Sequence, residues 1–339
     1  MAVNAETLAQ SSQQTQQLQA EFQALKSHLQ SVIVGQEGLL DRLLIALLTG
    51  GHVLLEGPPG LAKTTAVKAL ASGVHASFQR IQFTPDLMPS DVVGSEVLDM
   101  DSHSLRFVAG PIFHEIVLAD EINRAPPKVQ SALLEAMAEK QVTAGGETRP
   151  LPDTFLVLAT QNPLEQAGTY PLPEAQMDRF MLHVTMDYPD ATEELEILRR
   201  DRARHFGQEQ AKLQTLLTPE KVMQARRLVA EQYISEPVEQ YMVNLISATR
   251  KLETLSDDLA GVLQVGASPR ASIALLHAAS ANAWLQGRDF VTPDDVISML
   301  SDVLRHRLLL SFQGKSQQWT ADKVIQQILV KVPVPAGLD

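Results

Sequence analysis

The stretch "LLEGPPGLAKTTAV", residues 54–67, constrains the fold of this chain more than any other part of the sequence. The apolar residues 53–55 are typical of a strand, residues 57–60 of a tight turn, and Lys63 opens a predicted helix that ends near Ser72. A strand, turn and helix in this order point backbone N–H groups into a concavity at the helix N-terminus, where phosphate oxygens bind. The stretch therefore predicts a nucleotide-phosphate site in an α/β domain.

One residue departs from the usual phosphate-loop pattern, G-x-x-x-x-G-K-[ST], because Ala62 stands where the second glycine is expected. Alanine fits the loop if residue 62 already has right-handed helical φ and ψ, since the freedom of glycine is then not needed. Lys63 adds a positive charge for the phosphates, and Thr64 supplies a hydroxyl for Mg²⁺. The alternative is an ordinary strand–turn–helix with an incidental lysine, so the rest of the chain has to decide.

Two further polar clusters follow apolar strands. In "EIVLADEINRA", residues 115–125, the strand ends at Asp120, which is placed to hold Mg²⁺, and Glu121, which is placed to accept a proton from an attacking water. In "FLVLATQNP", residues 155–163, the strand is followed by Asn162, whose amide is placed to orient that water or to sense hydrolysis. The alternatives are a strand cap before a helix for the acidic pair and a turn residue before Pro163 for Asn162.

The hydrophobic pattern divides the chain into three parts. Residues 5–30 carry Leu8, Leu18, Phe22, Leu25 and Leu29 at helical spacing, which predicts an N-terminal helix over residues 1–30.

Between residues 31 and 189, short apolar runs alternate with helical stretches, and the runs at 116–119 and 155–159 are apolar without alternation. Strands read this way when both faces are covered, as in a parallel sheet flanked by helices. From 190 to 339 only helical patterns occur, so we expect an α/β domain followed by an all-helical one.

The composition limits the functions that fit. The net charge of −12 and the pI near 5.2 argue against a general nucleic-acid surface, which needs a basic stripe. The chain has no cysteine, so disulfides, thiolate metal sites and a cysteine nucleophile are excluded. The N-terminus lacks the features of a signal peptide, and no apolar run approaches the ~18 residues of a membrane helix. We therefore expect a cytoplasmic protein without a membrane-inserted segment.

The order of these motifs resembles that of the AAA+ ATPases, and specifically of the MoxR family. The resemblance covers about residues 31–310 and rests on residues 34–71, 107–143, 157–180 and 267–296. MoxR proteins also carry alanine before the lysine of the phosphate loop, so Ala62 fits the family. The resemblance implies an AAA+ P-loop domain with a helix-2 insert at residues 94–112, a pre-sensor-1 hairpin at residues 141–154 with Gly145 and Gly146 at its tip, and a helical lid.

The resemblance also assigns roles to residues. Glu121 would be the catalytic base, Asn162 sensor 1, Arg179 in "MDRF" the arginine finger, and Arg270 in "SPR" sensor 2, while Thr64 and Asp120 would bind Mg²⁺. ATP would be held by Val34, Gly35 and Gln36 around the adenine and by the phosphate-loop residues Gly57, Pro58, Pro59, Gly60, Leu61, Ala62, Lys63, Thr64 and Thr65.

One of these arginines has independent support. Ser268 and Pro269 are typical of an N-cap and first helical position, which places Arg270 in the first turn of a helix. A cation there opposes the helix dipole by about 0.3–1 kcal/mol, so we expect an anion such as a γ-phosphate to compensate. Arg179 has a simpler alternative, an ion pair with Asp178 or Glu174.

An arginine finger acts on the neighbouring subunit, so the resemblance implies a homo-oligomer, a hexameric ring in this family. The family typically works with a von Willebrand factor A-domain protein to mature or activate a client protein or complex. Phe83 and Phe107 are the candidates for a pore loop, but neither lies in the aromatic–hydrophobic–glycine motif of threading unfoldases.

Two other functions compete with a remodelling ATPase. A nucleic-acid motor of the same AAA+ branch is disfavoured by the charge of −12. A nucleotide-gated scaffold, in which hydrolysis is incidental, stays open. A small-molecule kinase is disfavoured because it gives Asn162, Arg179 and Arg270 no common purpose.

Overall fold

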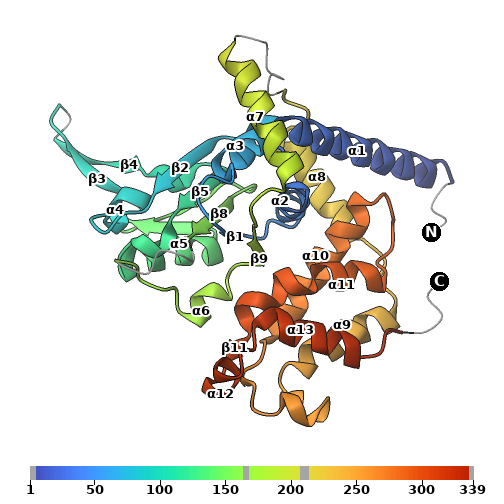
Figure 1. Ribbon diagram of the computed structural model, residues 1–339. Helices are drawn as coiled ribbons and strands as arrows, with labels where there is room; N and C mark the ends of the chain where they lie inside the picture. The colour runs from blue at the N-terminus through green and yellow to red at the C-terminus, as the bar shows by residue number, and fades with distance from the viewer. Residues whose placement is uncertain (1–4, 102, 163–167, 207–213, 336–339) are drawn as a thin grey trace. The chain divides into compact units, whose positions relative to one another are not determined.

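The computed structural model describes residues 5–101, 103–162, 168–206 and 214–335, with only the backbone for residues 5–12 and Arg204 (Figure 1). The chain forms two compact units. The sheet unit comprises residues 20–172 and 184–223, and the helical unit comprises residues 1–19, 173–183 and 224–339. These units are defined by proximity in space, so the domain boundaries predicted near residues 30 and 189 stay predictions.

The described residues form helices and strands in a mixed order. The helices are α1 (Ala5–Val32), α2 (Glu37–Thr49), α3 (Lys63–Gly73), α4 (Pro89–Val93), α5 (Pro127–Glu139), α6 (Glu174–Met177), α7 (Ala191–His205), α8 (Pro219–Ala230), α9 (Glu236–Ala248), α10 (Pro269–Leu285), α11 (Pro293–Leu304), α12 (Phe312–Ser316) and α13 (Ala321–Lys331). The strands are β1 (Val53–Glu56), β2 (Phe78–Gln82), β3 (Gly94–Asp99), β4 (Ser104–Ala109), β5 (Ile116–Asp120), β6 (Gln141–Ala144), β7 (Glu147–Pro150), β8 (Leu156–Gln161), β9 (Leu182–Thr185), β10 (Leu263–Val265) and β11 (Leu309–Leu310).

The main sheet has five strands in the order β2-β5-β8-β1-β9. The pairs β2/β5, β5/β8 and β8/β1 are parallel, and the residues of β5 and β8 up to their last positions are fully buried. The parallel pairing confirms the sheet expected from the apolar runs. Helices of the sheet unit such as α2, α3 and α5 lie around the sheet, which explains why its strands are apolar on both faces (Figure 1).

The N-terminal helix α1 packs against its own chain over its second half. Phe22, Leu25 and Leu29 have no exposed surface, and a Cβ atom placed on Gly73 would collide with Leu25 Cδ1. The predicted helix and its apolar face are therefore confirmed for these residues, whereas the side chain of Leu8 lies outside the described residues.

Two antiparallel hairpins interrupt the sheet unit, as the resemblance implied. Strands β3 and β4 pair over residues 94–109, and β6 and β7 pair over residues 141–150, with positive φ at Gly145 and Gly146 in the tip. Arg149 of β7 lies 4.0 Å from the ring centre of Phe107 in β4, so a cation–π contact joins the two hairpins. Phe83 is fully buried, which removes it as a pore-loop residue.

The helical unit is built around α9, α10, α11 and α13. Trp284, Tyr241, Met299 and Ile325 are among its buried side chains. The prediction that strands stop after residue 190 is wrong in one detail, because β10 and β11 form a two-stranded antiparallel sheet with Leu263 opposite Leu310. Strands this short carry no readable periodicity, and the pairing is made by residues distant in the sequence. None of the helices in the described parts of the chain has the length and apolar character needed to cross a bilayer.

A buried histidine anchors the 178–181 segment of this unit. His306 follows α11 in the 3-10 turn Arg305–Arg307, and its Nε2 lies 2.9 Å from the carbonyl oxygen of Phe180. Burial lowers the pKa of His306 well below its usual value, and the positive charge of Arg307 adds to that effect. The ring is therefore neutral near pH 7, with Nε2–H donating to the carbonyl.

We expect His306→Gln to weaken the pH dependence of stability, because glutamine keeps an N–H donor but does not titrate. The folded pKa lies below that of the unfolded chain, so wild-type stability is full above about pH 6.5 and falls as the pH drops below it, by up to about 1.4 kcal/mol per pH unit from this group. Urea titrations between pH 5 and 7.5, followed by the fluorescence of the two tryptophans, both in the helical unit, measure this slope. His205→Gln at an exposed position is the control, and equal slopes in wild type and His306→Gln would refute the prediction.

Candidate functional site

The carboxyl ends of the central strands meet the phosphate-loop region at a cavity of about 440 Å³ within the sheet unit. It brings together the sequence-predicted residues Gly57, Pro59, Gly60, Leu61, Ala62, Lys63, Thr64, Thr65, Asp120, Glu121 and Asn162. It also includes Arg80, Thr160 and Gln161, which the motifs did not single out as site residues. Residues from four separate stretches of the chain therefore face one cavity, at the edge where α/β sheets bind ligands.

The phosphate loop is held by close backbone packing. A Cβ atom on Gly57 would lie 2.7 Å from the carbonyl oxygen of Met186, so only glycine fits there. Gly60 has a φ of +86°, which also favours glycine. The loop then enters α3, whose first turn carries Lys63 and Thr64 and leaves backbone N–H groups for an anion.

Ala62 corrects an expectation drawn from the sequence. Its φ of 54° and ψ of 22° are left-handed, and not the right-handed values that would have made alanine an easy replacement for glycine. A left-handed conformation brings Cβ close to the following carbonyl oxygen and costs roughly 1–2 kcal/mol. The loop therefore keeps the backbone path that glycine would favour and accepts strain at residue 62.

Lys63 places an ammonium group at the cavity. Its Nζ donates a hydrogen bond to the carbonyl oxygen of Gly57 at 2.5 Å, which turns the side chain back over the loop. Burial lowers the pKa of Lys63, and the carboxylates of Asp120, Glu56 and Glu121 oppose that shift. The ammonium group thus sits among three acidic residues at the strand ends, where it can also meet the negative charge of a phosphate.

The Asp120 carboxylate is fixed by two neighbours. Its Oδ1 accepts from Thr160 Oγ1 at 2.5 Å, and its Oδ2 accepts from Arg80 Nη2 at 2.6 Å and Nε at 2.9 Å. Arg80 lies on β2 and Thr160 on β8, the two strands that flank β5. The sheet therefore locks the orientation of this carboxylate from both sides.

Glu121 has an unusual backbone and two side-chain partners. Its φ of 57° is left-handed, and its backbone N–H donates to Thr160 Oγ1 at 2.9 Å. Its Oε2 accepts from Gln82 Nε2 at 2.8 Å and lies 3.2 Å from Arg124 Nε. Strained non-glycine residues persist only where surrounding contacts over-determine them, and here Thr160 and Gln82 do so.

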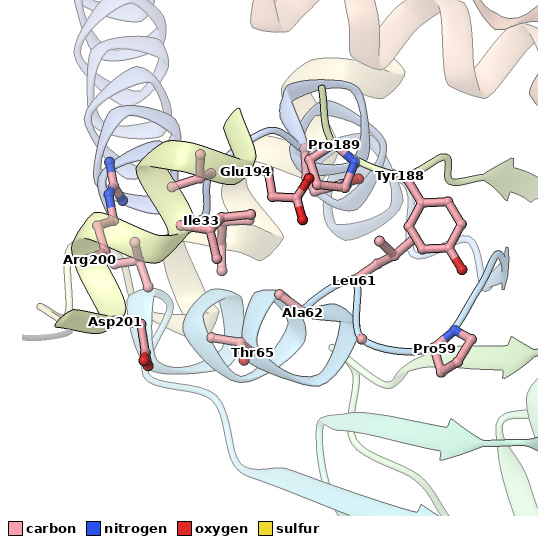
Figure 2. Close-up of a pocket in the computed structure, with 15 residues that line it drawn as sticks. Ile33, Pro59, Leu61, Ala62, Thr65, Tyr188, Pro189, Glu194, Arg200 and Asp201 are labelled. Atoms are coloured by element: carbon pink, nitrogen blue, oxygen red, sulfur yellow. The ribbon is translucent and has the colours of Figure 1, made fainter. Parts of the chain in front are cut away.

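A second cavity of about 500 Å³ adjoins the loop in the same unit, and Figure 2 shows the residues around it. Its walls are largely apolar, with Ile33, Leu61, Tyr188, Pro189 and Ile197 among them. A flat, largely apolar ring system such as a base fits a pocket of this kind beside a phosphate site.

Two of the three predicted adenine-pocket residues line this cavity. Val34 and Gln36 line it, whereas Gly35 faces the carboxylate of Glu193, which a Cβ atom there would approach to 2.8 Å. Arg200 of α7 is held in the wall by the carbonyl oxygen of Ser31 at 2.6 Å. Pro58 lines neither of the two cavities.

The two predicted arginines, Arg179 and Arg270, belong to the helical unit. Ser268 caps α10 by accepting from the Arg270 backbone N–H at 3.2 Å, as the sequence indicated. Arg270 is 64% exposed, and the anion that faces it within this unit is Asp178, at 3.6 Å from Nη1. The sequence had anticipated an anion for Arg270 but did not identify this carboxylate.

Sequence patterns could not reveal every residue of the site. Thr160 could have been found from the sequence, since it lies near the end of the strand that Asn162 follows. Its two hydrogen bonds, to the Asp120 carboxylate and from the Glu121 backbone N–H, depend on the neighbouring strand. Arg80 and Gln82 lie in a strand whose place beside β5 follows from sheet order, which no local motif encodes. Among the residues that the structure describes, no three His, Cys, Asp or Glu side chains converge as a metal cage.

Comparisons with known proteins agree with this geometry. Residues 52–182 match the ATPase family associated with various cellular activities (AAA), and residues 260–328 match the AAA lid domain. The chain is 44% identical to chaperone MoxR1 of Mycobacterium tuberculosis over 90% of its length and 80% of that protein. It is 31% identical to protein MoxR of Methylorubrum extorquens over 89% of the chain and 92% of that protein. A crystal structure from Cytophaga hutchinsonii superposes with a TM-score of 0.91 at 42% identity, covering 97% of this chain and 99% of that one.

We expect Ala62→Gly to stabilise the protein by up to ~1 kcal/mol. Relief of left-handed strain, roughly 1–2 kcal/mol, exceeds the roughly 0.4–1 kcal/mol that glycine adds to the entropy of the unfolded chain. Ala66→Gly in the same helix is the control, because its buried right-handed position should lose about 1 kcal/mol or more. Chemical denaturation of both variants measures the difference, and a loss of stability in Ala62→Gly would contradict the strain argument.

Proposed function

Since the chain belongs to the MoxR family of AAA ATPases, we propose that it binds and hydrolyses Mg-ATP as a homo-oligomer and uses this cycle to remodel, activate or mature a protein partner. The observation that carries the proposal is the convergence of Lys63, Thr64, Asp120, Glu121 and Asn162 on one cavity of the sheet unit. A cation, a hydroxyl, two carboxylates and an amide are the groups that phosphoryl-transfer sites of the P-loop class use.

ATP binding divides between the two cavities. The triphosphate lies against the loop of residues 57–65, where the N-terminus of α3 and the Lys63 ammonium attract its charge. The base and ribose enter the adjoining pocket beside Val34 and Leu61, where burial of the rings supplies binding free energy. Leu61 and Ala62 line both cavities, so the loop is the wall they share.

Glu121 acts as the general base that takes a proton from the attacking water. Its hydrogen bond from Gln82 and its ion pair with Arg124 orient the carboxylate, and both partners are within the sheet unit. Asn162, at the end of the neighbouring strand, orients the water or detects the loss of the γ-phosphate. General-base catalysis of this kind typically contributes about 10²–10⁴-fold to the rate.

Thr64 and Asp120 fit a magnesium site, because Mg²⁺ takes hard oxygen ligands and is usually bound through few protein groups together with phosphate oxygens and water. When bound, Mg²⁺ supplies positive charge that neutralises the phosphate oxygens. Arg80 and Thr160 keep the Asp120 carboxylate in place for it.

An oligomer follows from the role that we assign to Arg179. As an arginine finger, this residue completes the site of a neighbouring subunit, and such residues are worth about 10³–10⁵-fold in rate. Arg270 acts as the sensor of the γ-phosphate from the lid. Membership of the AAA family supports oligomerisation, and a hexameric ring is our specific proposal.

For the partner, we propose a von Willebrand factor A-domain protein together with a client protein or complex. The description of the 44% identical MoxR1 as a chaperone supports this class of function. A cytoplasmic location, a nucleic-acid partner and a nucleotide-gated scaffold stay as sequence-based hypotheses, of which the last two are separated by the experiments below.

We expect Glu121→Gln to lower kcat for ATP hydrolysis by about 10²–10⁴-fold while ATP affinity changes little, because the amide cannot accept the proton from water. A phosphate-release assay measures the rate, and a fluorescent ATP analogue measures affinity. Glu135→Gln, at an exposed position of α5, is the control that should keep wild-type turnover. Equal turnover in Glu121→Gln and wild type would remove Glu121 from the mechanism.

Partner capture with Glu121→Gln tests the remodelling function. We expect a von Willebrand factor A-domain protein or an enzyme subunit to be retained with ATP and released with ADP, since the ATP-bound state persists in this variant. Mass spectrometry of the two eluates identifies the partner. Nucleic acid in the eluate would instead favour the motor, and retention of the oligomer alone, with full cellular activity of Glu121→Gln, would favour the scaffold.

A further inference from the structure

A buried arginine of the helical unit, Arg307, holds the backbone on both sides of Arg179. Its Nη2 donates to the carbonyl oxygens of Asp178 at 3.2 Å and Phe180 at 2.8 Å, and its Nη1 donates to that of Met181 at 3.1 Å. Carbonyl groups before and after Arg179 are thus tied to one guanidinium group. A planar group with five fixed donors imposes geometry on its acceptors, which a flexible ammonium group cannot do.

The same guanidinium group is itself fixed. Its Nε donates to Asp178 Oδ1 at 2.7 Å, and the Arg307 side chain is only 3% exposed. Burial lowers the pKa of Arg307, and the Asp178 carboxylate opposes the shift. Its Nη1 also donates to the carbonyl oxygen of Val303. A buried charge of this kind is tolerated only with a partner and satisfied donors, so the ion pair and the carbonyl bonds form one unit.

Asp178 also contacts the predicted sensor. Its Oδ2 accepts from Ser268 Oγ at 3.1 Å and lies 3.6 Å from Arg270 Nη1. Ser268 is the N-cap of α10, and Arg270 lies in the first turn of that helix. The carboxylate of the residue directly before Arg179 therefore links the start of α10 with the buried Arg307.

Arg179 lies within this anchored segment. Its own backbone N–H donates to the carbonyl oxygen of Gln176 at 3.2 Å, and the next side chain, Phe180, is fully buried. The carbonyl oxygen of Phe180 also meets His306 Nε2 at 2.9 Å. The backbone is thus held before, at and after Arg179, whereas the Arg179 side chain itself is exposed.

We propose that Arg307 is a positioning residue for Arg179, and that Asp178 couples this position to Arg270. The inference rests on the proposed role of Arg179 as a finger that acts on the nucleotide of a neighbouring subunit. A catalytic cation has to be held within about 0.5 Å of its productive position, and a long side chain on a loose loop loses that position. Arg307 makes the backbone of residues 178–181 rigid through its hydrogen bonds and does not itself act on the nucleotide.

Arg307→Lys tests the proposal, because it keeps the charge and removes the fork of donors. Arg305→Lys is the matched control. Arg305 lies in the same turn and is 14% exposed. It donates to the carbonyl oxygen of His183 and pairs with Asp302 and Asp322, so its polar partners lie outside residues 178–181. Both lysine variants should lose similar stability, measured by chemical denaturation.

We expect Arg307→Lys to lower kcat at least tenfold with unchanged KM and unchanged binding of a fluorescent ATP analogue, while Arg305→Lys keeps wild-type kcat. Arg179→Ala gives the kcat that remains when the finger is absent. The double variant Arg179→Ala, Arg307→Lys should have a kcat no lower than that of Arg179→Ala alone. This non-additivity is the result that a merely structural role would not produce. Wild-type kcat in Arg307→Lys, or an additive loss in the double variant, would overturn the proposal.

Asp178→Asn is the second variant, in case Arg307→Lys does not fold. It keeps the shape of the side chain and weakens the ion pair with Arg307. We expect the same loss of kcat, again non-additive with Arg179→Ala. Size-exclusion chromatography at assay concentration checks assembly. If both variants fold and fail to assemble, the segment serves subunit contact, and the proposal fails. Wild-type protein without Glu121-dependent ATPase activity would instead defeat the proposed function itself, and with it the role of Arg307, so the two failures are distinguishable.

Discussion

The parallel register of the central strands is the constraint on which the site depends. Glu56 is paired with Gln161, and Gln82 with Asp120, so the last residues of four strands form a row along one edge of the sheet. Parallel strands end on the same side, and the row therefore exists before any side chain contact is made. The phosphate loop leaves β1 at this edge, which brings Lys63 and Thr64 to the same place as the acidic residues.

The candidate site is strained at two of its predicted residues. Ala62 and Glu121, neither of them glycine, both have left-handed backbones. Such residues cost about 1–3 kcal/mol each and need compensation from their surroundings. For Glu121 that compensation is visible in the hydrogen bonds to Thr160 and Gln82.

In both units, a second residue holds a group for which we propose a function. In the sheet unit, Arg80 and Thr160 hold Asp120, and Gln82 holds Glu121. In the helical unit, Arg307 holds the backbone around Arg179. In each case the supporting residue comes from a different part of the chain than the group it supports, so that the position of a flexible side chain is set by the rigid fold.

The sequence by itself determined the parallel α/β core, the N-terminal helix and the motif residues of the loop and strand ends, because each has a local pattern: unbroken apolar runs, helical spacing or a glycine-rich turn. It did not determine the left-handed backbone of Ala62, the short β10/β11 pair, or the roles of Arg80, Gln82 and Arg307. These depend on which strands lie side by side and on which carbonyl groups face a buried guanidinium, contacts between residues such as 80 and 120 or 178 and 307. Only the tertiary structure decides them, since hydrogen bonds and ion pairs act over a few ångströms in space, whatever the separation along the chain.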